Sequence, residues 1–264
     1  MFIIPAPTSV AFNLFSIPIY KYGIIMALAI FVAMLISNKL YNLYGEKKDL
    51  IVEYAPLMII LGIIGARLYF CALNYNFYLS NPIEIINLRQ GGLSVHGAIF
   101  LGILGVWFVA KKLKLSLLKI LDALSCATIF GQAIGRWGNY FNSEAFGFPV
   151  AEQNWGLFIP KNLRPVEFCD FSLFHPTFLY ESLLDLLGFI ILFIVFAKTG
   201  KNKPGLTFFA YLVIYSVIRF FIEGMRIDSA LNIGSIPIAE VVSLILFICG
   251  IIGIVKLCNN NSKI

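Results

Sequence analysis

The amino-acid sequence gathers residues suited to chemistry in one window, residues 131–147, which reads GQAIGRWGNYFNSEAFG. The window places one arginine, two asparagines and one glutamate among glycines: Arg136, Asn139, Asn142, Glu144, Gly135, Gly138 and Gly147. A guanidinium binds phosphate or carboxylate through a rigid fork, asparagine supplies donors and acceptors, and glycine lets the backbone approach a ligand. We therefore predict a site for an anionic ligand. The alternative is a helix end whose arginine reaches back to the lipid headgroups.

The window follows a long apolar run in a chain that is too apolar for a soluble domain. The 264 residues are 59% hydrophobic and 13% charged, with a mean hydropathy of +0.87, whereas soluble domains carry about 25% charged residues. We predict an all-α polytopic membrane protein, a single integral membrane domain over residues 1–264, with a small extracytoplasmic head at about 138–176. The seven predicted spans are about 18–38, 50–72, 94–110, 118–136, 177–197, 205–225 and 236–256.

The cations between these spans predict how the chain crosses the membrane. One set of connections carries only lysines: Lys39, Lys47, Lys48, Lys111, Lys112, Lys114, Lys119, Lys198, Lys201, Lys203, Lys256 and Lys263. The opposite set carries two lysines and every arginine: Lys21, Arg67, Arg89, Arg136, Lys161, Arg164, Arg219 and Arg226. Cytoplasmic loops are enriched in cations, so the larger set is predicted to be cytoplasmic. The N-terminus then lies outside and the C-terminus inside.

The restriction of arginine to the outer side indicates more than topology. Lysine suffices as a generic positive charge, whereas the planar fork of arginine binds phosphate or carboxylate through paired hydrogen bonds. We therefore predict an anion site at the outer leaflet of the membrane. Chance, or structural salt bridges, would give the same distribution and are the alternatives.

The two histidines stand near predicted outer helix ends. His96 lies in GGLSVHGAIFLG, residues 91–102, where glycines leave room for a ligand or another helix. A lone histidine in an apolar helix is also a common structural residue. His175 opens the segment HPTFLYES, which continues to Tyr180 and Glu181. There, a capped helix whose Glu181 pairs with an arginine is an equal alternative to catalysis.

Further charged side chains lie within the spans. The segment RFFIEGMR puts Arg219, Glu223 and Arg226 at positions i, i+4 and i+7, on one helical face. An Arg219–Glu223 pair is expected because paired charges are tolerated in a membrane, and it leaves Arg226 free at the outer end. Arg67 lies at a comparable depth in the second span. Tyr22 is either an interfacial aromatic residue or part of the site.

Neither a metal site nor nucleic-acid binding is expected. The five cysteines are scattered without a C-x-x-C pair, so we expect buried, inert thiols. With two histidines, a zinc site would need carboxylates to complete it. The net charge of +6 is divided among short loops, without the basic patch that nucleic-acid binding requires.

The spacing G-R-x-G-N-[aromatic]-x-N-x-E-x-x-G within residues 131–147 resembles the signature of the bacterial prolipoprotein diacylglyceryl transferases. Tyr140 stands where that family usually has phenylalanine. The family's His-Gly-Gly element is similar to the run that begins at His96, although Ala98 replaces the second glycine. A similar His-Pro…Tyr-Glu run covers residues 175–181. The family also treats as functional an arginine that matches Arg226, which Asp228 follows closely, and these elements occur in family order.

The resemblance implies an enzyme of the bacterial cytoplasmic (inner) membrane whose site faces the outer leaflet. The family moves the diacylglyceryl group of phosphatidylglycerol to the thiol of the lipobox cysteine in a preprolipoprotein signal peptide, as the first step of lipoprotein maturation. A thioether forms and glycerol phosphate leaves. The implied partners are these two substrates and membrane lipid, with no nucleic acid, no metal and no other cofactor. The implied catalytic residues are His96, Arg136 and Arg226. The implied substrate-binding residues are Arg136, Asn139, Asn142, Glu144, Tyr22, Arg67, Tyr180 and Glu181.

Two other classes of function would use the same residues. A transporter or channel for a small anion would use the outer arginines as a binding ring, but it needs polar groups along an inner exit path. Ionisable residues of the inner half are sparse: Glu53, Asp122 and Glu240. A structural assembly factor predicts that no chemistry is lost when His96 or Arg136 is replaced.

A cysteine thiol has a pKa near 8.5, so only a few per cent is thiolate near neutral pH and it needs activation. In one hypothesis His96 accepts the thiol proton, because an imidazole is largely neutral at pH 7. In the other, Arg136 and Arg226 lower the pKa of the thiol and His96 only positions lipid. The sequence does not separate the two. We also expect Asn139 and Glu144 to hold the signature loop, Glu144 by orienting an arginine.

Overall fold

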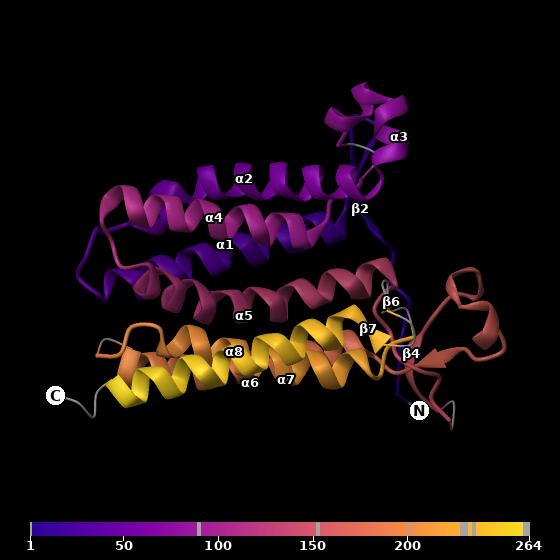
Figure 1. The fold of residues 1–264 in the computed structure, drawn as a ribbon. Coiled ribbons are helices and arrows are strands. Elements are labelled where there is room, and N and C mark those ends of the chain that lie inside the picture. The colour runs from indigo at the N-terminus through magenta and orange to yellow at the C-terminus, as the bar shows by residue number, and fades with distance from the viewer. Residues whose placement is uncertain are drawn as a thin grey trace. The chain divides into compact units, whose positions relative to one another are not determined.

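The computed structural model describes residues 2–88, 91–151, 154–200, 202–227, 232–233 and 236–260. Within these residues, seven helices are long and apolar enough to cross a membrane, which confirms the prediction of an all-α polytopic membrane protein (Figure 1). They are α1 (Lys21–Asn42), α2 (Leu50–Leu73), α4 (Val95–Leu113), α5 (Leu117–Asn142), α6 (Thr177–Val195), α7 (Leu206–Glu223) and α8 (Ile238–Asn260). A π-helical turn, η4 (Phe196–Gly200), follows α6.

The chain forms two compact units, and residues 1–37 and 122–264 make up the first. Glycines of α5 face α1 in this unit: a side chain at Gly131 would contact Ala29 and Ala33, and one at Gly138 would collide with the ring of Tyr22. Close helix packing against small residues is a common device in membranes and offsets the poor helix propensity of glycine. Helix α5 therefore continues to Asn142, where the sequence had predicted that the span ends near residue 136.

Helix α7 packs against both α6 and α8 in the same unit (Figure 1). Gly253 of α8 admits the ring of Phe209, because a side chain there would overlap that ring. At the start of α7, Asp122 of α5 accepts hydrogen bonds from the backbone N–H groups of Gly205 (2.6 Å) and Phe208 (2.7 Å). Asp122 is fully buried, and it satisfies main-chain donors that a helix start leaves without partners.

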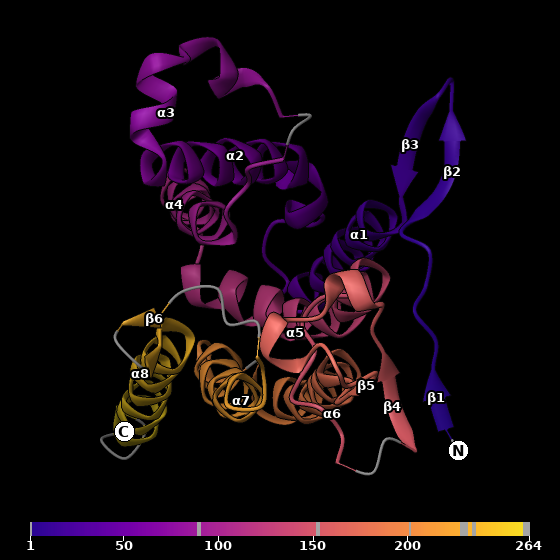
Figure 2. The ribbon, with the colours of Figure 1, turned by 90° about the vertical axis from the view of Figure 1, so that its right-hand side faces the viewer.

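Short strands lie outside the spans: β1 (Phe2–Ile4), β2 (Val10–Leu14), β3 (Ile17–Tyr20), β4 (Trp155–Phe158), β5 (Leu173–Phe174), β6 (Asn232–Ile233) and β7 (Ile236–Pro237). Strand β4 pairs in parallel with β1 and antiparallel with β5, and β2 and β3 form a hairpin (Figure 2). Strand β6 pairs antiparallel with β7. A buried apolar cluster supports the three-stranded sheet: Phe146, Leu157, Ile159, Phe174 and Phe178. The segment after α5 is thus structured around its own small core. Its place outside the cytoplasm stays a prediction.

Residues 38–121 form the second unit, in which α2 and α4 run side by side (Figure 1). Gly65 and Gly97 are the point of closest approach, because a side chain on either glycine would collide with the carbonyl of the other. Two short helices, α3 (Tyr75–Ser80) and η1 (Pro82–Ile86), connect α2 to α4.

A carboxylate holds the opposite end of this unit. Glu46 accepts hydrogen bonds from Lys119 Nζ (2.7 Å) and the Tyr41 hydroxyl (2.8 Å). Partial burial acts to raise the pKa of Glu46, but these bonds outweigh it and hold the pKa below its usual range.

The expectation of buried thiols is correct for two cysteines, Cys71 and Cys126. It is wrong for Cys249 and Cys258, which are exposed, while Cys169 is half-buried. Both exposed thiols lie on α8. Cys249 lies in the middle of the helix, where an outward-facing side chain meets lipid rather than water, so the apolar character that we read as burial does not require a protein neighbour; Cys258 lies in the last turn, at the end of the span.

Candidate functional site

Arg136 lies on α5 and makes an ion pair with Glu181 near the start of α6. Its Nη2 atom is 2.6 Å from Glu181 Oε1. Glu181 is 2% exposed, and a buried carboxylate requires a positive partner to remain charged. The pairing of Glu181 with an arginine was one of the two alternatives for the 175–181 run, and the structure contains it.

The pair is part of a longer chain of alternating charges on α5, α6 and α7, which we call the arginine–carboxylate chain: Arg136, Glu181, Arg219, Glu223 and Arg226. Arg219 joins both carboxylates, with Nη1 3.3 Å from Glu181 and Nη2 2.5 Å from Glu223. Arg226 Nη1 is 3.8 Å from Glu223. The Arg219–Glu223 pair is confirmed, whereas the expectation that Arg226 stays free is wrong. Glu223 serves both arginines because it lies four residues after one and three before the other.

The end of the signature window is built into this chain through the backbone. Gly147 forms an isolated β-bridge with Arg226, and its N–H donates to the carbonyl of His175 (2.9 Å). A side chain at Gly147 would press on the Met225 carbonyl and on Thr177. Glycine is therefore required for close backbone packing, which brings the segment after α5 against the end of α7.

The polar residues between Arg136 and Gly147 form a second, smaller cluster. Asn139 and Asn142 donate from their side-chain amides to Glu144 Oε1, at 2.9 and 3.4 Å. The backbone N–H of Glu144 also donates to the Asn139 carbonyl (3.1 Å). Asn139 and Glu144 thus hold the turn as expected, but Glu144 pairs with the two amides and not with an arginine. The two asparagines lie on the last turn of α5, so they reach Glu144 directly across the turn, which removes the need for a cation. The ring of Tyr22 packs against Gly138, the residue before Asn139.

His175 and Tyr180 lie beside the arginine–carboxylate chain at the start of α6. His175 Nδ1 is 3.2 Å from the Tyr180 hydroxyl, and the imidazole and the Trp155 ring form a T-shaped pair with 5.3 Å between their centroids. The structure thus brings Tyr180, Glu181, Arg136 and the signature polar residues into one unit.

His96 and Arg67 belong to the second unit. His96 lies in the first turn of α4, is exposed, and stands 6.0 Å from the Tyr69 ring between centroids. Within the described residues, no other side chain binds its imidazole by a hydrogen bond or ion pair. The two candidate residues Arg89 and Asp228 lie outside the described residues.

Arg67 is fully occupied by main-chain carbonyls. Its five N–H groups make five hydrogen bonds of 2.5–3.0 Å. The acceptors all lie in the connection before α4: Glu84, Ile85, Asn87, Gly91 and Gly92. A guanidinium has five donors, so this arrangement leaves none for a phosphate. The geometry therefore favours a structural role for Arg67, in place of the substrate contact that the resemblance implied.

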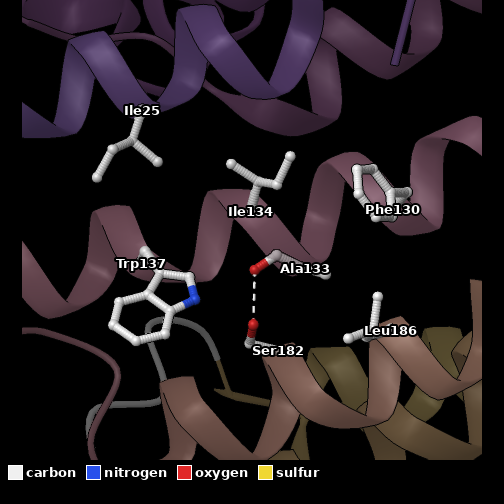
Figure 3. A pocket seen from close by; sticks show the side chains of 7 residues that line it. All are labelled: Ile25, Phe130, Ala133, Ile134, Trp137, Ser182 and Leu186. Atoms are coloured by element: carbon white, nitrogen blue, oxygen red, sulfur yellow. Dashed lines mark hydrogen bonds between the residues drawn. The ribbon is translucent and has the colours of Figure 1, made fainter. Parts of the chain in front are cut away.

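An apolar groove opens beside α5 (Figure 3). It has a volume of about 280 Å³, and α1, α5 and α6 supply its lining: Ile25, Phe130, Ala133, Ile134, Trp137, Ser182 and Leu186. The Ser182 hydroxyl donates to the Ala133 carbonyl (2.7 Å) and so presents no free donor, and the indole N–H of Trp137 is the other polar group of the lining side chains. Trp137 and Ser182 are the residues next to Arg136 and Glu181 in sequence. The groove therefore adjoins a charged pair and suits an alkyl chain.

Sequence reasoning missed two features of the site. Arg219 was read only as the partner of Glu223, yet it joins the two carboxylates at the centre of the chain. Asp185, on α6, was not singled out although it is buried one helical turn from Glu181. The i, i+4 spacing of Glu181 and Asp185 was the available signal.

Among the described residues, no group of histidine, cysteine, aspartate and glutamate side chains is arranged to hold a metal.

The fold and this site define a polytopic membrane protein in which buried carboxylates hold three arginines at neighbouring helix ends. The sequence pattern of the prolipoprotein diacylglyceryl transferase family matches residues 9–256. A phosphatidylglycerol–prolipoprotein diacylglyceryl transferase of Prochlorococcus marinus (strain MIT 9301) is 39% identical, over 95% of this chain and 92% of its own. One of Clostridium novyi (strain NT) is 38% identical, over 94% and 95%. The chain belongs to the prolipoprotein diacylglyceryl transferase family, and it is a multi-pass bacterial membrane protein.

Proposed function

We propose that this protein transfers the diacylglyceryl group of phosphatidylglycerol to the thiol of the lipobox cysteine of a preprolipoprotein. The new bond is a C–S thioether, and the bond that breaks joins the diacylglyceryl carbon to a phosphate oxygen. Glycerol phosphate leaves with the electron pair, and the thiol proton passes to a base. The observation that carries the proposal is the arginine–carboxylate chain. It occurs in a protein whose relatives are named for this reaction.

The arginines supply what this reaction needs most, because negative charge grows on the leaving phosphate as the C–O bond breaks. Preplaced guanidinium groups stabilise such charge in a site that excludes water. Their carboxylate partners hold each fork in place before the lipid arrives, so little reorganisation is required. Arg136 is 19% exposed at its side chain and Arg226 14%, so neither is sealed off from a ligand.

The apolar groove beside Arg136 offers a place for one acyl chain of the lipid. A phosphate at Arg136 would stand at the end of the groove where Trp137 and Ser182 lie. The diacylglyceryl group would then extend along α5 between Ile134 and Leu186. Burial of methylene groups contributes about 0.8 kcal/mol each and would favour lipid over a water-soluble phosphodiester.

We assign the thiol proton to His96. Its exposed imidazole has no hydrogen-bond partner among the described residues, so a ring nitrogen is available to accept a proton. The competing assignment, in which the arginines alone lower the thiol pKa, predicts that replacing His96 weakens lipid binding without changing the dependence of rate on pH.

The site should face the outer leaflet, with the N-terminus outside and the C-terminus in the cytoplasm, because the lysine-rich connections predict the cytoplasmic side. In this topology the sheet-bearing segment after α5 is the extracytoplasmic head. The protein's own thiols test it: an impermeant reagent applied to cells with an opened outer barrier should label Cys169 and spare Cys258. Labelling of Cys258 alone would reverse the topology, and a Cys169→Ala variant is the control for the assignment.

The test of the function is a reconstituted reaction. Purified protein, phosphatidylglycerol and a lipobox peptide should yield a peptide heavier by one diacylglyceryl group. A matched peptide with serine for cysteine should gain nothing, since a hydroxyl is a far weaker nucleophile at neutral pH. Absence of the adduct from folded wild-type protein would reject the proposal. An anion transporter would instead move glycerol phosphate across liposomes without producing an adduct.

A further inference from the structure

Among the described residues that line the apolar groove, Trp137 alone carries an open hydrogen-bond donor. Its indole N–H makes no hydrogen bond to any described residue. The Ser182 hydroxyl is bound to the Ala133 carbonyl, and the other lining side chains are hydrocarbon. In Figure 3 the nitrogen of the indole lies on the edge of the ring turned toward Ala133 and Ser182, so the donor faces other walls of the groove.

Neighbouring rings hold the indole in this orientation. The Trp137 ring forms T-shaped pairs with Phe178 (5.6 Å between centroids) and with Tyr140 (6.2 Å). Phe178 is 1% exposed and belongs to the buried cluster that supports the three-stranded sheet, while the Tyr140 hydroxyl donates to the Pro5 carbonyl (2.9 Å). The donor is therefore held in place before a ligand arrives, so little conformational entropy is lost when an acceptor binds to it.

The lipid expected in the groove brings acceptors of the matching kind. Esters join the acyl chains of phosphatidylglycerol to glycerol, and an ester carbonyl loses water when it enters an apolar groove. Trp137 follows Arg136 directly on α5, and Ser182 follows Glu181 directly on α6. A lipid whose phosphate meets Arg136 carries its esters only a few bonds further along. The N–H of the groove and the carbonyl of the lipid then satisfy each other.

We propose that the indole N–H of Trp137 donates a hydrogen bond to an ester carbonyl of phosphatidylglycerol, which makes the enzyme prefer ester-linked lipid to ether-linked lipid. The inference rests on the proposed transferase function, to which it adds a specificity-determining residue. The ester takes no part in the bond that breaks, so its contact is the same before and during the reaction. It therefore raises kcat/KM through binding of the lipid and leaves kcat unchanged.

The test is a competition between phosphatidylglycerol and a dialkyl ether analogue with the same headgroup and chain length, in one reaction with a lipobox peptide. The two adducts differ in mass, and their ratio gives the ratio of the two kcat/KM values. A neutral hydrogen bond changes an equilibrium by about threefold to tenfold, so the wild-type protein should favour the ester by that factor. Trp137→Phe keeps an aromatic ring without the donor, and it should use the two lipids within about twofold of each other.

The ratio does not depend on how much of a variant folds, because both lipids compete for the same active molecules. Trp137→Leu is a second variant without the donor, for the case that Trp137→Phe is inactive. Trp107→Phe is the matched control. Trp107 is another exposed tryptophan of a spanning helix, its ring lies 5.0 Å from Lys111 Nζ, and it does not line the groove. Its variant should keep the wild-type preference.

The wild-type ratio can overturn the inference on its own, if the protein shows no preference for the ester. The inference is also overturned if the Trp137 variants keep the wild-type preference, as they would if Trp137 were an interfacial tryptophan whose N–H meets water. Loss of the preference in Trp107→Phe would overturn it as well. A wild-type protein that forms no adduct from either lipid would reject the transferase function itself, which is a different outcome.

Discussion

Replacement of Arg136 by lysine should be far from conservative. The lysine keeps the positive charge, but its donors radiate from a single nitrogen and cannot form the planar fork that pairs with a phosphate through two parallel hydrogen bonds. Arg136 is bound to Glu181 at 2.6 Å through Nη2, and its Nε is buried, so Nη1 is the nitrogen that stays available to a ligand. A charge-assisted hydrogen bond contributes roughly 1.5–3 kcal/mol, and loss of one in the transition state slows the reaction about 10- to 100-fold.

The assay is kcat and KM of purified Arg136→Lys for adduct formation, with Tm measured in the same detergent. Arg164→Lys is a suitable control, because Arg164 also bonds through its guanidinium, to the carbonyls of Ile159 (2.8 Å) and Cys169 (3.0 Å), away from the arginine–carboxylate chain. That control should change Tm more than kcat. If Arg136→Lys folds and turns over within about threefold of wild type, the fork of Arg136 is not what stabilises the leaving phosphate.

Three further outcomes follow from the structure. Gly138→Ala puts a Cβ 2.8 Å from a ring carbon of Tyr22, so it should destabilise the protein by about 1–3 kcal/mol. Gly102→Ala adds a Cβ in open space and should leave Tm unchanged, so equal Tm values for the two variants would contradict the close packing at Gly138. His96→Gln should be severely slowed at pH 7 and partly recover toward the thiol pKa of about 8.5; a flat profile would assign His96 to lipid positioning. Folding lowers the pKa of Glu46, so the ionised carboxylate stabilises the protein at any pH above its ordinary pKa of 4.5. The Tm difference between wild type and Glu46→Gln should therefore shrink as the pH falls below 4.5. A difference that does not change with pH would show that the charge of Glu46 contributes nothing to stability.

The sequence was sufficient for the spans and for the signature, because both are local patterns. Apolar length predicts a membrane helix, and the i, i+4 spacing of Arg219 and Glu223 predicts their pair. The end of the fourth span was misjudged for a physical reason: polar residues and glycines look like the end of a helix. In the structure these glycines face α1, and the helix continues to Asn142.

Partners that are distant in sequence could not be predicted from the same patterns. Glu181 joins Arg136 and Arg219 from three different helices, and no spacing rule selects one arginine for it. Arg67 looked equivalent to Arg136 in depth and charge, yet its donors are all taken by the carbonyls of one connection. We therefore expect the number of donors left open, and not the residue type, to separate a binding arginine from a structural one.

The most direct measurement follows the oxygen atom that links the diacylglyceryl carbon to phosphorus. Phosphatidylglycerol with a heavy-oxygen label at that position is incubated with the wild-type protein and a lipobox peptide, and both products are weighed. The account predicts an unlabelled thioether peptide and glycerol phosphate that carries the label, in equal amounts. Label retained in the peptide, or glycerol phosphate released without the adduct, would contradict attack of the thiol at carbon with phosphate as the leaving group.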